Sequence, residues 1–433
     1  MLKSKNEKGN LLTSYQDRKI NDFLHRHLLD PECFEWRTEL ERFLAEMESV
    51  RNGANGSVKM IPTWIKKLQP LERPVSVTAI DIGGTNVRST VVTLDKKGII
   101  GIDTLPTFAT PGIQEQITTE EFFRRIVCRL GRHLETDNIG ICFSLATIPL
   151  EDGDAIVSAG AKQIEVVDLL GKRVGQSFRN AARDLGFPND QKITVINDTV
   201  AAALSGWANH QEDNYSGFAG FIYGTGTNVA YQENDEVMIN IESGAYCGFP
   251  TGDIDDLFDA TLIDANQDRF EKMVSGGYQG GLMSCILREA VEENLLYTDF
   301  LERLTTVRKS GIISAKDISE YSHGGTDENV FYSTCRDDYE RFVLVELFEA
   351  VCRRSALLCS ITIIGALLRA KKDPETPAFI TAEGSTYLKQ MNFSTYLDAY
   401  LQKNGKALGG LPYEIHSTEN AVIKGTAISA LLH

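Results

Sequence analysis

The spacing of apolar residues along the chain changes near residue 75. Between residues 15 and 50 they recur at helical intervals, as at Ile20, Phe23 and Leu24. The segment RNGANGS (51–57) ends this pattern with two Asn/Gly clusters, which are typical of a loop. From residue 75 the apolar runs become short and rich in β-branched residues, which predicts strands. These runs are VSVTAIDI (75–82), VRSTVVTL (87–94), IGICFSLA (139–146) and KITVIND (192–198).

Helical patterns lie between these strands, over residues 120–135 and 168–186. Strands that alternate with helices predict an α/β fold, here with a largely parallel sheet behind an initial antiparallel hairpin. A second hairpin with a glycine turn, GFAGFIYGTGTNVAYQEN (217–234), repeats the design of the first and suggests an internal duplication. The remaining pattern predicts helices over 267–301 and 339–370, a third strand with a glycine break at 377–387, and a C-terminal helix that packs back on the first half.

Length and charge narrow the class of protein. A chain of 433 residues suggests two domains, here close together with a cleft between them. The formal net charge of -16 argues against a nucleic-acid partner or an anionic membrane surface. It does not exclude a phosphorylated ligand, because backbone N–H groups also bind phosphate.

The chain offers no targeting or metal signal by spacing. The N-terminus MLKSKNEKGN has no apolar core of a signal peptide, and no apolar stretch reaches the roughly 18 residues of a membrane span. None of the eight cysteines forms a C-x-x-C pair, and no histidine lies at metal-ligand spacing beside them, so we expect no structural zinc site. We expect a cytoplasmic protein with reduced thiols and no membrane partner.

Two glycine turns carry the first chemical signal. DIGGT (81–85) and YGTGT (223–227) each join two apolar strands and place a threonine beside bare backbone. Such a turn lets N–H groups approach a phosphate that a Cβ would block. One such hairpin is more often an ordinary turn, but two at corresponding places suggest facing clamps on a polyphosphate. Neither turn has the sequence of a P-loop or of a Rossmann site.

The second signal is VINDTVAAALSG (195–206), where a β-branched run ends at Asn197 and Asp198 and a helix begins at once. In α/β sheets the carboxyl end of a strand is the usual place for a ligand. The alternative is that Asp198 merely caps the helix. Ser144, Asn228 and Glu242 are further polar residues in apolar strands or at their ends. Because burying them without partners costs stability, they suggest a polar ligand with many hydroxyl groups.

In combination these segments resemble the eukaryotic-type hexokinases of the actin-like ATPase superfamily. SVKMIPTWI (57–65), AIDIGGTNVRSTVV (79–92), TVINDTVAA, FIYGTGTNVAY, NIESGAY and RFEKMVSGGYQGGL (269–282) follow the order and spacing of the family's motifs. The resemblance runs from about residue 40 to the end. It implies two ribonuclease H-like (actin/hexokinase-type) domains around a central cleft. The implied small domain is 72–208 with the C-terminal helix at about 421–433, and the large domain is 12–71 with 209–420.

The resemblance also implies roles for single residues. Asp198 would be the catalytic base, with Lys162 beside it, and Asp81 would hold Mg²⁺ through water. The sugar would be bound by Ser144, Lys162, Asn197, Asp198, Asn228, Glu242 and Glu271. The nucleotide would be bound by Asp81, Gly83, Gly84, Thr85, Asn86, Arg88, Gly224, Thr225, Gly226, Gly384, Ser385 and Thr386.

The implied reaction is phosphorylation of a hexose, with glucose the default, at its 6-hydroxyl by ATP and Mg²⁺. The implied assembly is a monomer or homodimer. One alternative is a sugar sensor without turnover, which gains some support from two departures. The family's threonine before the lysine is Ala161 here, and its C-terminal S-G-x-G-A-A is replaced by VIKGTA (422–427). The second departure also leaves a different phosphoryl donor open. Another alternative is an actin-like assembly protein, which has no need of the sugar residues.

Overall fold

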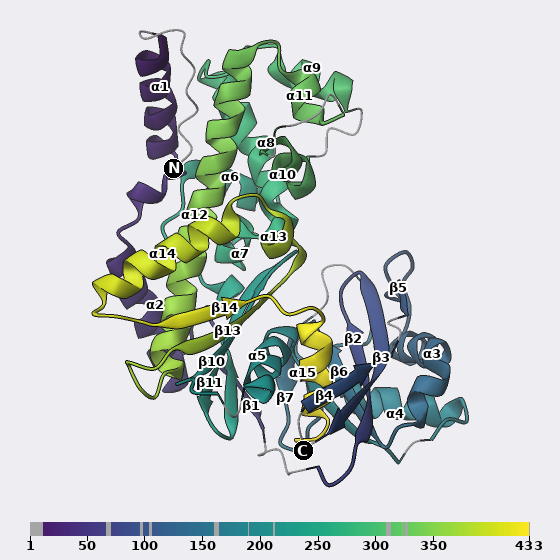
Figure 1. Cartoon of the computed structure of the whole chain (residues 1–433). Coiled ribbons are helices and arrows are strands. Elements are labelled where there is room, and N and C mark those ends of the chain that lie inside the picture. Colours follow the sequence, from purple (N-terminus) through teal and green to yellow (C-terminus); the bar gives the residue numbers. More distant parts are fainter. Residues whose placement is uncertain are drawn as a thin grey trace.

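The first sheet is built on a hairpin of β2 (Val75–Ile82) and β3 (Asn86–Asp95) (Figure 1). The hairpin is antiparallel, whereas β6 (Asn138–Phe143) and β9 (Lys192–Ile196) continue the sheet parallel to β2. β4 (Gly98–Ile102) pairs with the outer side of β3, so the strand order is β4-β3-β2-β6-β9. The predicted hairpin followed by parallel strands is therefore confirmed. The computed structural model describes residues 12–65, 71–95, 98–103, 106–159, 164–188, 190–210, 213–308, 313–322, 324 and 328–432.

The second sheet repeats the first in order and direction. Its strands pair as β12-β11-β10-β13-β14, with β1 (Ile61–Trp64) added beside β12. The first three strands are antiparallel neighbours, and the last two run parallel to β10. The predicted duplication is confirmed at the level of topology, since each glycine turn joins the first two strands of its sheet. The strands are β10 (Phe218–Tyr223), β11 (Thr227–Asn234), β12 (Val237–Asn240), β13 (Ala378–Glu383) and β14 (Tyr413–His416).

Two helices cover the outer face of the first sheet. α3 (Thr119–Leu130) begins at the Thr118 cap, continues as the 3-10 helix η2 (Gly131–Glu135), and packs with α4 (Val174–Asp184) over a core of phenylalanines and aliphatic residues. α4 starts six residues later than the predicted helix over 168–186. The reason is tertiary, because the segment before it bonds to a neighbouring strand through Val157 N–H to Lys172 O and Gly171 N–H to Val157 O. The short strands here are β5 (Thr107–Ala109), β7 (Thr147–Pro149) and β8 (Ala155–Val157).

α5 (Asp198–Asn209) and α15 (Ala421–Ser429) lie side by side between the two sheets (Figure 1). α15 rests on β2 and β6 of the first sheet, and α5 rests on β10 of the second. A Cβ at Gly425 would come within 1.8 Å of the carbonyl oxygen of Ala201, so the two backbones touch directly. The prediction that the C-terminal helix packs back on the first half is confirmed.

The remaining helices surround the second sheet and extend beyond it. The helical pattern over 267–301 forms two helices, α7 (Arg269–Val274) and α8 (Gly276–Glu292), rather than one. α7 and α8 are separated by Ser275 in extended conformation, because Gly276 and Gly277 donate their N–H groups to carbonyls of the second glycine turn. The helices that surround and extend beyond the second sheet are α1 (Leu12–Arg26), η1 (Pro31–Cys33), α2 (Trp36–Arg51), η3 (Ser243–Ala245), α6 (Asp253–Ala260), α7 (Arg269–Val274), α8 (Gly276–Glu292), α9 (Phe300–Val307), α10 (Ala315–Ser322), α11 (Val330–Thr334), α12 (Asp338–Ala370), α13 (Ser385–Lys389) and α14 (Phe393–Ala407).

α12 corrects one expectation from the sequence. It contains an 18-residue window with mean hydropathy 1.7, so an apolar stretch of membrane-spanning length and composition does exist. Of that window, 89% is buried inside the structure. Aliphatic residues on several sides of the helix pack against the second sheet and against α2 and α14, which explains the continuous apolar run. α12 is therefore a core helix of the part of the protein built on the second sheet, which we call the larger lobe.

The contact between α5 and α15 predicts that a Gly→Ala substitution in α15 destabilises the protein, which is the reverse of the usual effect in a helix. Gly→Ala inside a helix ordinarily stabilises by about 1 kcal/mol. Gly425→Ala should instead lower the free energy of unfolding by about 1–3 kcal/mol, because its methyl group overlaps the backbone of Ala201. Gly101→Ala is the control, since its Cβ would meet only the Thr93 side chain at 4.0 Å. Urea denaturation measures both, and a stabilised Gly425→Ala variant would contradict the packing described.

Candidate active site

Carboxylates from both sheets meet where the parallel strands end. Asp81 lies near the end of β2, Asp198 lies two residues after the end of β9, and Glu383 is the last residue of β13. Their charges act on one another, since Asp81 affects the pKa of both Asp198 and Glu383. Ser144 follows β6 and donates its N–H to Ile82 O at 3.1 Å, which keeps it beside Asp81. The strand ends of two sheets thus form one site, as expected for α/β folds.

Asp81 is buried and held by an arginine on the neighbouring strand. Arg88 Nε and Nη2 donate to Asp81 Oδ2 at 3.0 and 2.6 Å, and the two residues are direct partners across β2 and β3. Asp81 is only 6% exposed, so this pairing offsets part of the cost of burying its charge. Arg88 lies in the predicted phosphate loop, but in this structure its contact is with the carboxylate.

Asn197 and Asp198 divide two tasks at the start of α5. The Asn197 side chain is the helix cap and accepts the N–H groups of Thr199 and Val200 at 2.9 and 3.4 Å. Asp198 Oδ1 accepts the N–H and hydroxyl of Thr199 at 2.7 and 3.1 Å, which fixes the orientation of the carboxylate. Asn197 is therefore the N-cap of α5, and the alternative that Asp198 is only a helix cap is wrong.

The carboxylate cluster carries excess negative charge. Burial first, and then the charge of Asp81, raises the pKa of Asp198 above its ordinary value, against hydrogen bonds from Thr199 and Ser144. Burial also raises the pKa of Glu383, where Arg88 and the N–H of Val422 act in the opposite direction. Arg88 acts on this cluster as a cation, through its contact with Asp81 and its charge near Glu383. The donor set fits Mg²⁺, which prefers carboxylate oxygen and would relieve the repulsion.

A chain of side-chain amides leads from Asn228 to Glu242. Asn228 Nδ2 donates to Asn240 Oδ1 at 2.8 Å, and Asn240 Nδ2 donates to Glu242 Oε1 at 2.7 Å. Asn228 Oδ1 also accepts the N–H of Ser243 at 3.1 Å. The chain orients Glu242 and leaves each amide paired, as buried polar groups require. Asn240 did not emerge from the sequence reading, although it is a polar residue in a buried strand like Asn228.

Glu242 occupies a strained and electrostatically unfavourable position. Its backbone has φ 53° and ψ 51°, the left-handed region that non-glycine residues rarely adopt. Burial, together with the charges of Asp198 and Asp268, raises the pKa of Glu242 to about 7, against the hydrogen bond from Asn240. The influence of Asp198 places the two predicted sugar residues within electrostatic reach of each other. Strain of this kind is typical of functional sites.

Glu271 joins this group from α7. Its Oε2 accepts the N–H of Thr227 at 3.1 Å, at the end of the second glycine turn. Gly226 and Gly244 both lie against the same carboxylate, since a Cβ on either would stand 2.5 or 3.0 Å from Oε2. The two glycines therefore leave room for Glu271 as well as for any ligand.

Hydrogen bonds to nearby segments hold each glycine turn in place. In the first, Gly83 donates its N–H to Asn86 O at 3.0 Å, while the Thr110 hydroxyl donates to Gly83 O and its N–H to Thr85 O. Gly84, Thr85 and Asn86 are partly or fully exposed at the tip. The turn is thus rigid at its base and has accessible backbone at its tip.

The second turn packs against the start of two helices. Gly224 O accepts the N–H of Gly276 and the hydroxyl of Thr386, each at 2.9 Å. Gly384 has φ 125°, and a Cβ there would stand 2.2 Å from Tyr223 O, so only glycine fits. Gly224, Thr225 and Gly226 are therefore contiguous with Gly384, Ser385 and Thr386, as a shared nucleotide site requires. The Thr386 hydroxyl donates its proton to Gly224 O and so does not donate it to a ligand in this structure.

One predicted residue and several unpredicted ones complete the account. Lys162 lies outside the described residues, so its predicted role is untested. Glu383 and Gly276 did not emerge from the sequence reading. A carboxylate at a strand end was the signal for Asp198 and applies equally to Glu383. No sequence signal distinguishes Gly276, whose role depends on a contact between distant segments.

Two sheets of equal strand order, with carboxylates at strand ends and a glycine turn in each sheet, define an actin-like ATPase fold of the sugar-kinase type. Two family models, both described as hexokinase, match residues 19–207 and 218–432. The chain belongs to the hexokinase family. It is 27% identical to hexokinase-2 of Equus caballus over 90% of this chain and 45% of the relative, and 24% identical to hexokinase-1 of Schizosaccharomyces pombe over 95% and 92%. It spans about half the length of the horse relative.

Solved structures agree on the fold. A hexokinase from Schistosoma mansoni complexed with glucose has a TM-score of 0.77 at 22% identity and covers 96% of this chain and 99% of its own. A ROK family glucokinase from Streptomyces griseus in complex with glucose and AMPPNP has a TM-score of 0.52 at 17% identity, covering 82% and 99%. The predicted fold of two actin-like domains around a cleft is confirmed. The residue bounds of the domains stay a prediction.

The raised pKa of Glu242 makes a prediction about stability. The folded state binds this proton more tightly than the unfolded chain, whose glutamate pKa is about 4.3, so stability from this group is lost as the pH rises through about 7. Glu242→Gln carries no charge at any pH. We expect it to unfold at a higher temperature than the native chain at pH 8 without sugar, and the difference to shrink at pH 5. Exposed Glu236→Gln is the control and should show no such difference; equal behaviour of both variants would contradict the assignment.

Proposed function

We propose that this protein transfers the terminal phosphoryl group of ATP to the 6-hydroxyl of a hexose, with glucose as the default acceptor. The observation that carries the proposal is the arrangement around Asp198. This carboxylate is oriented by Thr199, coupled to Asp81 on one side and to Glu242 on the other, and lies where both sheets end. Membership of the hexokinase family and the glucose complex of the Schistosoma mansoni relative support the same acceptor.

Asp198 is suited to act as the base. A carboxylate with an ordinary pKa near 3.9 is a weak base at neutral pH, and a raised pKa makes it a better proton acceptor. Its orientation is set by two hydrogen bonds on Oδ1. Because phosphoryl transfer has a loose transition state, positioning and electrostatics supply most of the rate. Asp198 would take the proton of the attacking hydroxyl as the phosphoryl group arrives.

The sugar and the nucleotide would use separate parts of the site. Asn228, Glu242 and Glu271 form a polar surface on the larger lobe that suits several hydroxyl groups. The backbone of the two glycine turns would receive the phosphates, as N–H groups at tight turns do. Asp81 would hold Mg²⁺, and when bound this ion neutralises charge on the phosphates. The AMPPNP complex of the Streptomyces griseus glucokinase supports ATP as donor.

The decisive variant is Asp198→Asn, which keeps the size and the Oδ1 acceptor but removes the base. We expect turnover to fall by about 10²–10⁴-fold while sugar binding survives. In the native protein kcat/KM should fall on the acidic side through a pKa above the ordinary aspartate value, because the base must be ionised. Asp184→Asn, at the exposed end of α4, is the control and should leave turnover unchanged.

The assay couples ADP formation to a panel of glucose, mannose, fructose and a hexosamine, with ATP, other nucleotides and polyphosphate as donors. Retention of more than roughly a tenth of the activity in Asp198→Asn would place the base elsewhere. Sugar binding by the native chain without turnover on any hexose would favour the sensor. Nucleotide-dependent filaments, seen by light scattering, would favour the assembly protein. Location in the cytoplasm and oligomeric state stay predictions.

A further inference from the structure

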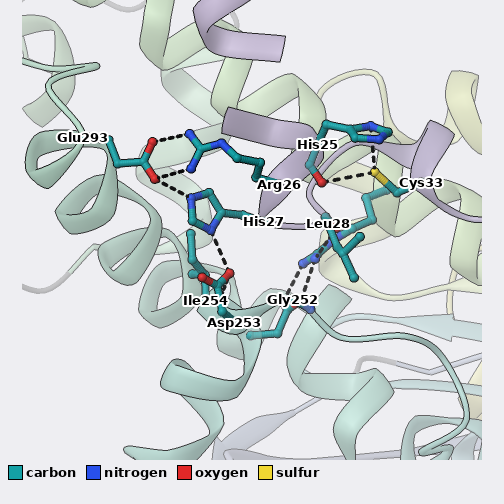
Figure 2. A network of polar contacts seen from close by, with 11 residues as sticks. His25, Arg26, His27, Leu28, Cys33, Gly252, Asp253, Ile254 and Glu293 are labelled. Atoms are coloured by element: carbon teal, nitrogen blue, oxygen red, sulfur yellow. Dashed lines mark hydrogen bonds and ion pairs between the residues drawn. The ribbon is translucent and has the colours of Figure 1, made fainter. Parts of the chain in front are cut away.

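A second polar cluster lies at the turn that follows α1 (Figure 2). His27 is 4% exposed, and its ring nitrogens face carboxylates from two other helices. Nδ1 lies 2.7 Å from Asp253 Oδ1 on α6, and Nε2 lies 3.0 Å from Glu293 Oε1 at the end of α8. α8 begins beside the second glycine turn, about 25 Å away at 1.5 Å per residue, so the cluster is separate from the site above.

Two glutamates one helical turn apart complete the cluster. The ligand atoms of His27, Glu289 and Glu293 all lie within 4.8 Å of one another. Glu289 is half-buried, and its carboxylate forms neither a hydrogen bond nor an ion pair with any residue that the structure describes. Positions i and i+4 of a helix face the same side, so both carboxylates approach the ring nitrogen together.

The backbone holds His27 in this place. Leu28 has φ 51°, which a leucine rarely adopts, and its carbonyl accepts a hydrogen bond from the buried Arg354 at 3.1 Å. Gly252 packs against the His27 carbonyl, where a Cβ would stand 2.0 Å from the oxygen. The same residue precedes Asp253, so one close contact sets both the ring and its carboxylate partner.

We propose that His27, Glu289 and Glu293 form a binding site for a divalent cation of the zinc type. With Nδ1–H donating to Asp253 and no proton on Nε2, the lone pair of Nε2 faces Glu293 Oε1, and a cation bound between these two atoms would stabilise both. A carboxylate behind a histidine is the usual support of a zinc ligand, because it fixes the tautomer and increases basicity. One imidazole nitrogen and two carboxylates are also a zinc donor set that leaves a position for water.

Arg26 is the competitor for this position. Its Nη1 donates to Glu293 Oε1 at 2.7 Å, and its Nη2 donates to Oε2 of the same carboxylate. The Arg26 side chain is 56% exposed, so it can turn into solvent when a cation arrives. Exposed ion pairs of this kind are weak. The guanidinium thus stands in for the cation, and its removal should strengthen metal binding.

The test uses the full chain after treatment with a chelator, titrated with Zn²⁺ by calorimetry and with Co²⁺ by visible absorption. All proteins carry Cys33→Ser, because Cys33 Sγ lies 3.2 Å from His25 Nδ1 and this pair is a second soft site nearby (Figure 2). We expect one equivalent to bind, with a Co²⁺ spectrum of low coordination number. Zn²⁺ should also raise the thermal midpoint, since it joins the turn after α1 to α8.

Variants of the proposed ligands and of Arg26 should change the affinity for Zn²⁺ in opposite directions. Glu289→Gln and His27→Gln should weaken binding at least tenfold, and Asp253→Asn by about 10–100-fold. Arg26→Gln should strengthen it by about two- to fivefold. Glu292→Gln, an exposed neighbour on α8, is the matched control and should change nothing.

Three outcomes would overturn the proposal. They are the absence of saturable binding at one equivalent, binding indifferent to Glu289→Gln, and an equal loss in the Glu292→Gln control. Glu289 has no described partner to lose, so its variant tests the site without a structural defect. Each of these results would leave the cluster as a hydrogen-bonded contact of the turn after α1 with α6 and α8, without a metal. The proposal is independent of the phosphoryl-transfer reaction, which would remain as inferred.

Discussion

The backbone contact between α5 and α15 is the constraint on which the site depends. α5 begins at Asp198 and rests on the second sheet, whereas α15 rests on the first. In the first turn of α15, the Val422 N–H donates a hydrogen bond to Glu383 Oε2 at 2.9 Å. Gly425 removes the side chain that would otherwise separate the helices. Because the two helices touch, the carboxylates of two different sheets come within electrostatic reach of one another.

That proximity is costly for the protein without its ligands. Burial and mutual repulsion raise the pKa of Asp198, Glu242 and Glu383, and Glu242 also occupies a left-handed backbone conformation. These terms oppose folding, so the core around α12 and both sheets must supply the offsetting stability. A cation and a sugar with many hydroxyl groups would relieve the same repulsion. The features that destabilise the free protein are therefore those that favour the bound one.

Local patterns predicted the strands well and the helices less well. The predicted strand 75–82 is identical to β2, since alternation and β-branched residues act within one strand. The helix over 168–186 starts late because Gly171 bonds to Val157 of a neighbouring strand, and the helix over 267–301 is broken because Gly276 and Gly277 bond to the second glycine turn. The prediction that no apolar stretch reaches membrane-spanning length was wrong for α12, and only the burial of this helix shows why it is apolar.

The sequence by itself determined the two glycine turns, the strand ends that carry Asp81 and Asp198, and the repeat of the glycine hairpin. Each follows from neighbours within a few residues, through backbone freedom at glycine and the period of side chains. Tertiary structure decided which of these groups act together. The contact of Glu383 with α15 and the cluster at His27 depend on distant parts of the chain, since 39 positions separate Glu383 from Val422 and 266 separate His27 from Glu293. Spacing cannot signal such contacts, because packing and electrostatics join residues that the chain itself keeps apart.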